Sequence, residues 1–279
     1  MIGPARLALV PQGHGLAVRG LGAQAPVAGL MLGRRVEEVA RLLPALFGLC
    51  RAVQETALAL ALDQPLPDPA ALRRDMIRDH LAKFCLHLPR RLGLPVQPLP
   101  QGWAEGGAAL HRAIEGLAAP ILAAVAQAFA PGEAVSQLPA MLDPFAETHS
   151  ENSLATRHAG HHRLVAAQAQ GHGPLAHLVA RVLDLEVLAL GQMPSPRRLP
   201  DGTALVPCSR GLCALRLRVA GGIVTGFDRA TPTDHLLMPG GLLAASLATL
   251  PADRAGLAPL LVDILDPCIA LQVEGAAHA

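Results

Sequence analysis

The chain has very few aromatic residues and almost no net charge. Only 2% of its 279 residues are Phe, Trp or Tyr, and Tyr is absent, although 51% of the residues are apolar. Ala and Leu must therefore fill most of the core, which favours closely packed helices. The formal net charge is +1, so no broad basic face points to a nucleic-acid partner. We expect a mainly α protein of α+β character.

The sequence also lacks a secretion signal and a long uninterrupted apolar run. No apolar stretch with a cleavage site follows Met1. The most apolar segment, residues 116–130, contains Gln127 and is shorter than the roughly 18 residues that a membrane span requires. These features predict a soluble, cytoplasmic protein with no membrane partner.

Cysteine is scarce, and its placement does not suit a disulfide framework. The five cysteines are odd in number and irregularly spaced, which favours a reducing compartment. Cys50 and Cys268 lie near opposite ends of the chain, each at the boundary of an expected element, so they are candidates for a metal site that folding brings together. Thiolates bind soft or borderline metals, but two are too few to complete a four-coordinate site. For the remaining three, Cys85, Cys208 and Cys213, we expect packing roles.

The sequence pattern predicts one domain, 1–279, made of three successive regions. Residues 1–31 are an N-terminal β segment with a hairpin at 5–19, and residues 32–200 are helical. Residues 201–279 contain a hairpin that turns at Gly221-Gly222, followed by C-terminal helices. Pro44 should kink a helix over 34–62 or split it in two. Cys50 would lie near the start of the second piece, 48–62, where the helix N-terminus would lower the thiol pKa. Further helices are expected over 69–87, 105–130 with a break near Pro120, 175–190, 240–250 and 254–263.

Histidine is concentrated in one polar segment. His158 and His162 would share a helix face, as metal ligands often do, but no acidic residue completes a set at a regular spacing. We expect a solvated loop, with a metal site, for example for nickel, as the alternative. We also expect His80, Lys83 and His87 to mark an exposed helix face. The clustered histidines are His149, His158, His161, His162, His172 and His177.

Four segments resemble the large subunit of nickel-iron hydrogenases, in the same order along the chain. That family has an N-terminal segment ending in a pair of cysteines, a Pro-Arg-Gly segment, a Pro-Thr-Thr segment and a C-terminal Asp-Pro-Cys motif. The matching segments here are Gly48-Leu49-Cys50, Ser209-Arg210-Gly211, Thr231-Pro232-Thr233 and Asp266-Pro267-Cys268. The resemblance implies the helical core of a shortened hydrogenase large subunit.

Departures from the family pattern change the function that the resemblance implies. In the enzymes four thiolates hold nickel, and two of them bridge to an iron that carries cyanide and carbon monoxide. Phe47 and Leu271 stand where this family has its other two cysteines. Arg210 is kept, and its match lies over the iron and its diatomic ligands. This combination resembles the branch of hydrogenase expression and formation proteins of the HupK and HoxV type.

The resemblance therefore implies a non-catalytic scaffold in hydrogenase maturation. Cys50 and Cys268 would hold an iron-dicyanide-carbonyl group transiently, with nickel disfavoured. Arg210, Pro232 and Thr233 would contact this group. The implied partners are the apo large subunit of hydrogenase and a small maturation chaperone.

Three other functions remain open from the sequence. The chain could be a divergent nickel-iron hydrogenase, although two of the four thiolates are missing. It could be a metal-free interaction partner of the maturation machinery. It could also be a nickel store built on the clustered histidines.

Overall fold

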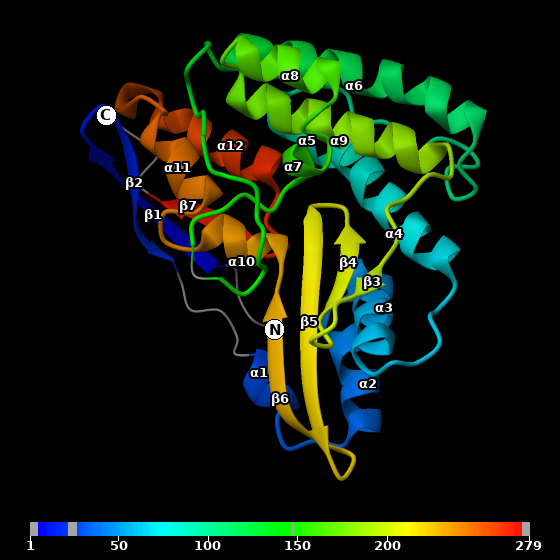
Figure 1. Ribbon diagram of the computed structural model, residues 1–279. Helices are drawn as coiled ribbons and strands as arrows, with labels where there is room; N and C mark the ends of the chain where they lie inside the picture. Colours follow the sequence, from blue (N-terminus) through cyan, green and yellow to red (C-terminus); the bar gives the residue numbers. More distant parts are fainter. Residues whose placement is uncertain (1–4, 22–26, 147, 275–279) are drawn as a thin grey trace.

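The computed structural model describes residues 5–21, 27–146 and 148–274 and confirms a mainly α protein with two small sheets (Figure 1). A 3₁₀ turn (Gly48–Cys50), a π turn (Lys83–His87) and a second 3₁₀ segment (Ala252–Leu257) link some of the helices. The helices are α1 (Val27–Met31), α2 (Val36–Leu46), α3 (Arg51–Ala61), α4 (Pro69–Ala82), α5 (Leu88–Leu92), α6 (Ala108–Ala128), α7 (Leu154–Arg157), α8 (His162–Ala169), α9 (Gly173–Ala189), α10 (Pro232–Leu237), α11 (Leu242–Ala248) and α12 (Ala258–Leu265).

The N-terminal sheet joins the two ends of the described chain. The predicted hairpin is confirmed as β1 (Ala5–Gln12) and β2 (Gly15–Leu21), which pair antiparallel. The unpredicted strand β7 (Leu271–Glu274) lies parallel to β1, with Ala5 opposite Leu271. Val27–Met31 is helical, so the predicted β segment 1–31 does not consist of strands throughout.

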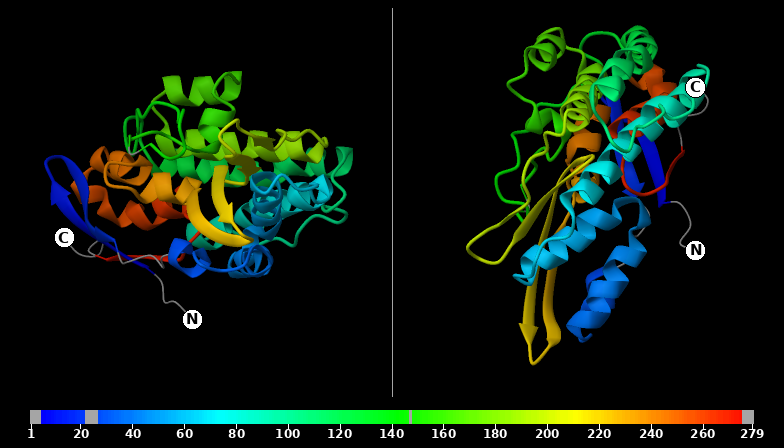
Figure 2. Two further views of the ribbon diagram at one scale, coloured as in Figure 1. Left: turned by 60° about the horizontal axis from the view of Figure 1, so that its bottom comes forward. Right: turned by 90° about the vertical axis from the view of Figure 1, so that its right-hand side faces the viewer.

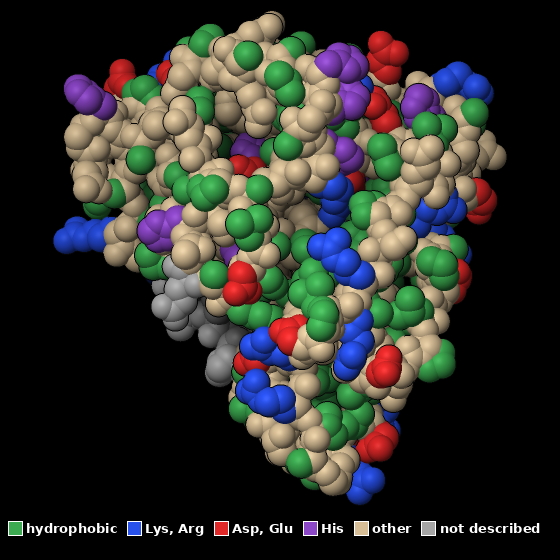
Figure 3. All heavy atoms as spheres, in the orientation of Figure 1, with side chains coloured by type: hydrophobic (Ala, Val, Ile, Leu, Met, Phe, Trp, Pro, Cys, Tyr) green, Lys and Arg blue, Asp and Glu red, His purple; other side chains and the backbone are tan. Residues whose placement is uncertain are grey.

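The second sheet has the order β3-β4-β5-β6 and carries a long hairpin. Its strands are β3 (Arg197–Arg198), β4 (Ala204–Cys208), β5 (Gly211–Ala220) and β6 (Ile223–Ala230). The β5–β6 turn is the predicted glycine pair: Gly221 and Gly222 both have positive φ, as a two-residue hairpin turn of this type requires. Figure 1 and Figure 2 show this ribbon extending away from α6, α8 and α9, with α2 beside it. Figure 3 shows that its surface mixes charges of both signs, because Arg216 and Arg218 pair with Asp228.

The chain breaks between α2 and α3, just before the predicted second piece at 48–62. Pro44 lies inside α2, and the helix ends at Leu46. The 3₁₀ turn follows, and Cys50 becomes the N-cap residue of α3. The prediction that Cys50 starts the second piece is confirmed, although Pro44 does not cause the break.

Two other prolines interrupt their helices less than the sequence suggests. Pro120 lies inside the continuous helix α6. Gly116, four residues earlier, has no side chain, and both residues are exposed, so water can reach the carbonyl that Pro120 leaves unbonded. Pro89 falls in the first turn of α5, where a missing N–H costs little. The helical path from α4 therefore continues through the π turn to Leu92.

Helix α6 is longer than the apolar segment seen in the sequence. Its 21 residues are apolar enough to cross a membrane by length and composition, so the expectation that this segment is too short is wrong. A bent pair of segments, 232–248 and 252–265, passes the same test only if both count as one span despite a 111° bend. One face of α6 is buried at helical spacing, whereas Arg112 and Glu115 lie on the exposed face. This pattern is typical of an amphipathic helix that packs one face against a hydrophobic core. The buried residues on that face include Leu110, Ile114, Leu117, Ile121 and Val125.

One hydrophobic cluster draws residues from all three predicted regions of the chain. Leu7 and Leu9 of β1, Leu81 of α4 and Leu261 of α12 all belong to it. Helix α4 has a local reason to begin where it does: the Asp68 carboxylate accepts a hydrogen bond from the Ala70 N–H at 2.9 Å. Helix α4 contacts α3, α9 and the 3₁₀ turn that carries Cys50.

Candidate functional site

Helix α4 holds the backbone around Cys50. The Asp75 carboxylate accepts a hydrogen bond from the Ala52 N–H at 3.1 Å, which satisfies an N–H group at the start of α3. Arg78 pairs with Asp75 at 3.0 Å and donates to the Leu49 carbonyl at 3.1 Å. These contacts fix the direction in which Cys50 leaves the 3₁₀ turn.

Thr233 holds the backbone of Cys268. Its hydroxyl accepts a hydrogen bond from the Cys268 N–H at 2.8 Å. Thr233 is buried in α10, which starts at a capping box formed by Thr231 and Asp234. Pro232 is buried in the first turn of the same helix. Thr233 therefore lies at the predicted site, where its hydroxyl contacts the peptide of Cys268.

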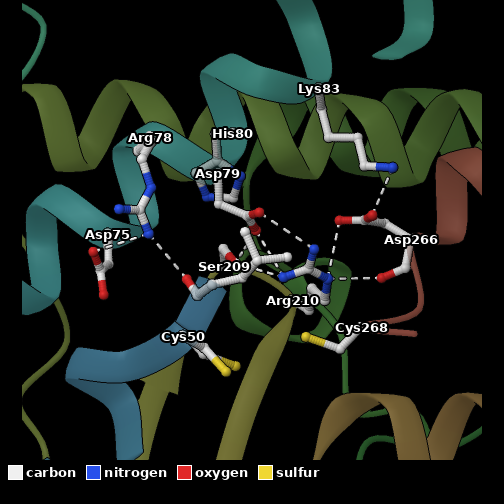
Figure 4. Close-up of polar contacts among 12 residues, drawn as sticks. Cys50, Asp75, Arg78, Asp79, His80, Lys83, Ser209, Arg210, Asp266 and Cys268 are labelled. Carbon is white, nitrogen blue, oxygen red and sulfur yellow. Dashed lines mark hydrogen bonds and ion pairs between the residues drawn. The ribbon is translucent and has the colours of Figure 1, made fainter. Parts of the chain in front are cut away.

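The two cysteines meet in space. Both are half-buried, and Figure 4 shows their sulfur atoms beneath the Arg210 side chain. A hydrogen bond between the two thiols is the main influence on both: it lowers the pKa of Cys268 to about 7 and raises that of Cys50 far above its usual value. Burial acts to raise both pKa values, whereas the Arg210 charge favours the Cys268 thiolate. The prediction that the helix N-terminus lowers the Cys50 pKa is therefore wrong.

Arg210 is largely buried, with 10% of its side chain exposed, and is held by two carboxylates. Its Nη1 donates to Asp79 Oδ2 at 2.7 Å and its Nη2 to Asp79 Oδ1 at 3.3 Å. Its Nε donates to the Asp266 carbonyl at 2.8 Å and lies 3.0 Å from Asp266 Oδ2. Nη1 also reaches Ser209 Oγ at 3.2 Å. Of the five N–H groups of a guanidinium, these contacts with described residues leave one.

Asp266 lies at the centre of a buried group of cations. It pairs with Lys83 at 2.6 Å, Arg181 at 2.9 Å and Arg210 at 3.0 Å. Burial would raise its pKa, but Arg210, Arg181 and Lys83 outweigh burial and hold the pKa well below its usual range. Asp266 also ends α12 in the left-handed conformation, at φ 58°. Its backbone and its side chain together place the residue before Pro267 and Cys268.

The ion pairs continue through His80 to Asp184. His80 is fully buried, with Nε2 2.8 Å from Asp184 Oδ2 and Nδ1 3.2 Å from Arg181 Nη1. A guanidinium only donates, so Nδ1 accepts and the ring proton belongs on Nε2. Burial lowers the pKa of His80, which agrees with a neutral ring. His80 and Lys83 are buried, so the prediction of an exposed face is wrong for these two residues, whereas His87 is exposed as predicted.

Asp184 connects this chain of contacts to the β4–β5 turn. It accepts from Arg157 at 2.8 Å and lies 3.0 Å from His158 Nε2. Arg157 also donates to the carbonyl of Cys208 at 2.9 Å and to that of Gly211. Arg157 therefore supports the turn that carries Arg210 through contacts separate from those of Asp79.

The other three cysteines are buried. Burial raises the pKa of Cys85, that of Cys208, and that of Cys213 to about 12. Cys208 and Cys213 lie near enough to raise the pKa of Cys50, whereas no other thiol influences Cys85. Packing accounts for Cys85, whereas Cys208 and Cys213 lie near the pair formed by Cys50 and Cys268.

The clustered histidines do not converge on one point. His158 ends α7 and His162 begins α8, so they share no helix face, and the prediction that they do is wrong. His161 and His162 stack on each other, with ring centroids 4.5 Å apart. His177 lies 3.9 Å from Glu151 at the edge of a cavity of about 390 Å³. Across residues 5–21, 27–146 and 148–274, no three His, Cys, Asp or Glu side chains are grouped to hold a metal ion.

Several residues of the site were not predicted from the sequence. Asp75, Asp79 and Lys83 recur at helical spacing on α4 and the π turn that follows it, but they resemble an ordinary charged surface. Arg181 and Asp184 lie in a mostly apolar helix, where charged residues must be paired if buried. That rule could have singled them out before the structure was known.

Comparison with known proteins assigns the fold and then the family. No protein-family model matches the chain. The structure is similar to a [NiFeSe] hydrogenase from Desulfovibrio vulgaris Hildenborough (G491S variant), with a TM-score of 0.61 at 13% identity over 92% of this chain and 93% of that one. It is also similar to an NAD⁺-reducing [NiFe]-hydrogenase, with a TM-score of 0.52 at 14% identity over 92% of both chains. The chain therefore has a nickel-iron hydrogenase fold.

The sequence comparison identifies the family within this fold. The chain is 49% identical over 270 residues to the hydrogenase expression/formation protein HupK of Rhodobacter capsulatus, covering 91% of each protein. The chain belongs to this family of hydrogenase expression/formation proteins. The expected resemblance is confirmed, and this relative is a formation protein rather than a catalytic hydrogenase.

Proposed function

We propose that this protein is a non-catalytic scaffold in nickel-iron hydrogenase maturation. In this role Cys50 and Cys268 hold an iron-dicyanide-carbonyl group as cargo and pass it to the apo large subunit. The observation that carries the proposal is the contact between two thiols from opposite ends of the chain, each on a fixed backbone. The membership in a formation-protein family supports the same role.

A site with two protein ligands is better suited to transferring an iron group than to storing it. Structural metal sites close their coordination with four protein ligands. Within the described residues no group of three or more His, Cys, Asp or Glu side chains could hold a metal, so an iron held by Cys50 and Cys268 would need ligands of its own. Two thiolates can be displaced one at a time by thiolates of an acceptor protein.

The protonation of the pair also suits capture and release. A thiolate, rather than a thiol, binds metal. With a pKa of about 7, Cys268 is substantially ionised at neutral pH, whereas Cys50 keeps its proton. Iron would meet Cys268 first and displace one proton from Cys50. A proton returned to Cys50 would loosen the same bond on release.

Arg210 has a narrower role in this proposal than the resemblance implies. Its described partners occupy four of its five N–H groups. One N–H remains for a cyanide nitrogen, and the main effect of Arg210 is to favour the Cys268 thiolate. Thr233 acts through the Cys268 backbone, and Pro232 shapes the start of α10. The proposed partners are the apo large subunit and a small maturation chaperone, in the cytoplasm.

Infrared spectroscopy tests the scaffold directly. The protein is produced together with the hydrogenase maturation proteins, purified without oxygen and analysed for iron. We expect cyanide and carbonyl bands in the parent and their loss in Cys50→Ser and in Cys268→Ser. Cys85→Ser is the matched control, because Cys85 is a buried thiol that no other thiol influences.

Two results would count against the scaffold. Bands that survive in both Ser variants would move the cargo to another site. A parent protein with neither bands nor iron would favour a metal-free interaction partner.

A further inference from the structure

Cys50 has a second polar neighbour, which belongs to a group that we call the Arg229 flank: Phe47, Gln54 and Arg229. The buried Gln54 amide donates to Cys50 Sγ at 3.8 Å and accepts from Arg229 Nε at 3.4 Å. The Arg229 guanidinium lies 4.2 Å above the Phe47 ring. The Phe47 ring and the Gln54 amide thus hold the Arg229 cation, and Gln54 lies between this cation and Cys50.

The charge on Arg229 is not balanced by a carboxylate in the residues that the structure describes. Arg210 has Asp79 and Asp266, and Arg216 has Asp201 and Asp228. The contacts of Arg229 with described residues are Gln54 and Phe47, both uncharged. The flank therefore places a positive charge against the Gln54 amide that contacts Cys50, and the amide oxygen already accepts from Arg229.

We infer that Arg229 affects which metal centre binds to the thiol pair. Its charge favours a metal centre that already carries anionic ligands over a bare divalent ion. The inference rests on the proposed function for the identity of the site and adds the class of cargo that it accepts. Two thiolates balance a divalent ion, so an extra cation nearby raises the energy of the bare complex. Anionic ligands on the metal reverse the sign of that interaction.

Cobalt(II) titration of the metal-free protein tests the selection without the cargo. Cobalt bound to thiolates has charge-transfer absorption that reports on Cys50 and Cys268. We expect Arg229→Gln to bind cobalt roughly tenfold more tightly than the parent, from the loss of one nearby charge. Arg229→Met, which keeps apolar contact with Phe47, should show the same gain. Arg229→Lys keeps the charge, and Arg198→Gln removes an exposed Arg on β3, so both should match the parent.

The absorption must disappear in a variant that carries both Cys50→Ser and Cys268→Ser. Thiol-dependent cobalt binding with equal affinity in the parent, Arg229→Gln and Arg229→Met would overturn the inference. Absence of thiol-dependent binding in all variants would overturn it as well, because removing the charge would then not admit a bare ion. A parent without infrared bands would remove the scaffold proposal but would leave the cobalt result readable.

Discussion

Cys50 and Cys268 are in contact with each other, yet their surroundings shift the two thiol pKa values in opposite directions. Cys268 follows Asp266 and lies beside Arg210, and its pKa falls to about 7. Cys50 caps a helix, a position that ordinarily favours a thiolate, but its pKa rises. The hydrogen bond between the two thiols decides this difference, and burial reinforces it for Cys50.

The two cysteines are also held by different kinds of contact. The Cys268 side rests on three buried cations around one carboxylate. The Cys50 side rests on backbone contacts from Asp75 and Arg78. A strong ionic framework therefore fixes the anionic thiol, and weaker contacts hold the protonated one. The predictions below disturb the two sides in turn.

The largest effect should come from Asp266 on the Cys268 side. Asp266→Asn keeps a residue that tolerates the left-handed conformation but leaves Lys83, Arg181 and Arg210 without their shared carboxylate. We expect the free energy of unfolding to fall by about 3–5 kcal/mol, measured by denaturant titration. Asp263→Asn is the control: Asp263 pairs with Arg91 near the surface, and its loss should cost under about 1 kcal/mol. Equal losses in the two variants would contradict the special role of Asp266.

The same framework predicts a loss of stability in acid. The pKa of Asp266 is held low in the folded protein, so its contribution is complete above the unfolded value of about 3.9 and is lost as the pH falls through the folded value. Burial lowers the pKa of His80, so the unfolded chain takes up that proton first below about pH 6.5, which weakens the fold further. Unfolding at a series of pH values should show both steps, and Asp266→Asn should make the lower one smaller. Part of it should remain, because the pKa of Asp184 is also held well below its usual range.

Thr233 offers a smaller test of the same side. Thr233→Val keeps the side-chain shape but removes the acceptor of the Cys268 N–H. We expect a loss of about 2 kcal/mol in the free energy of unfolding, with less iron retained after loading. Thr225→Val is a suitable control, because that exposed hydroxyl donates to a carbonyl in the β5–β6 hairpin. Iron retention equal to that of the parent would show that the Cys268 backbone needs no such support.

Local patterns predicted most of the elements but fewer of the site contacts. The glycine pair at 221–222 and the alternation before it predicted the β5–β6 hairpin. Strands β4 and β7 were missed because β4 is buried along its whole length, so it shows no alternation, and β7 is only four residues long. The break before Cys50 was predicted, but for the wrong reason, because Pro44 is tolerated inside α2.

The pairing of the two cysteines depends on contacts that no local pattern contains. Motif order indicated that Cys50 and Cys268 belong together, and the structure brings them into contact. The pKa values could not be predicted, because they depend first on the hydrogen bond between the two thiols and then on the burial of each. The partners of Arg210 could not be predicted either, since Asp79 is 131 positions away along the chain.

The smallest predicted effect is a change in the pKa of Cys268 alone. Cys50→Ala removes the thiol that donates to the Cys268 thiolate, which is the first cause of its low pKa. We expect the pKa of Cys268 to rise from about 7 by roughly one unit, equivalent to about 1.4 kcal/mol. Alkylation of Cys268, followed by mass spectrometry as a function of pH, would report the midpoint, with Cys85→Ala as the control. An unchanged midpoint would mean that Arg210, rather than Cys50, sets the charge of Cys268, and the two thiols would then act independently.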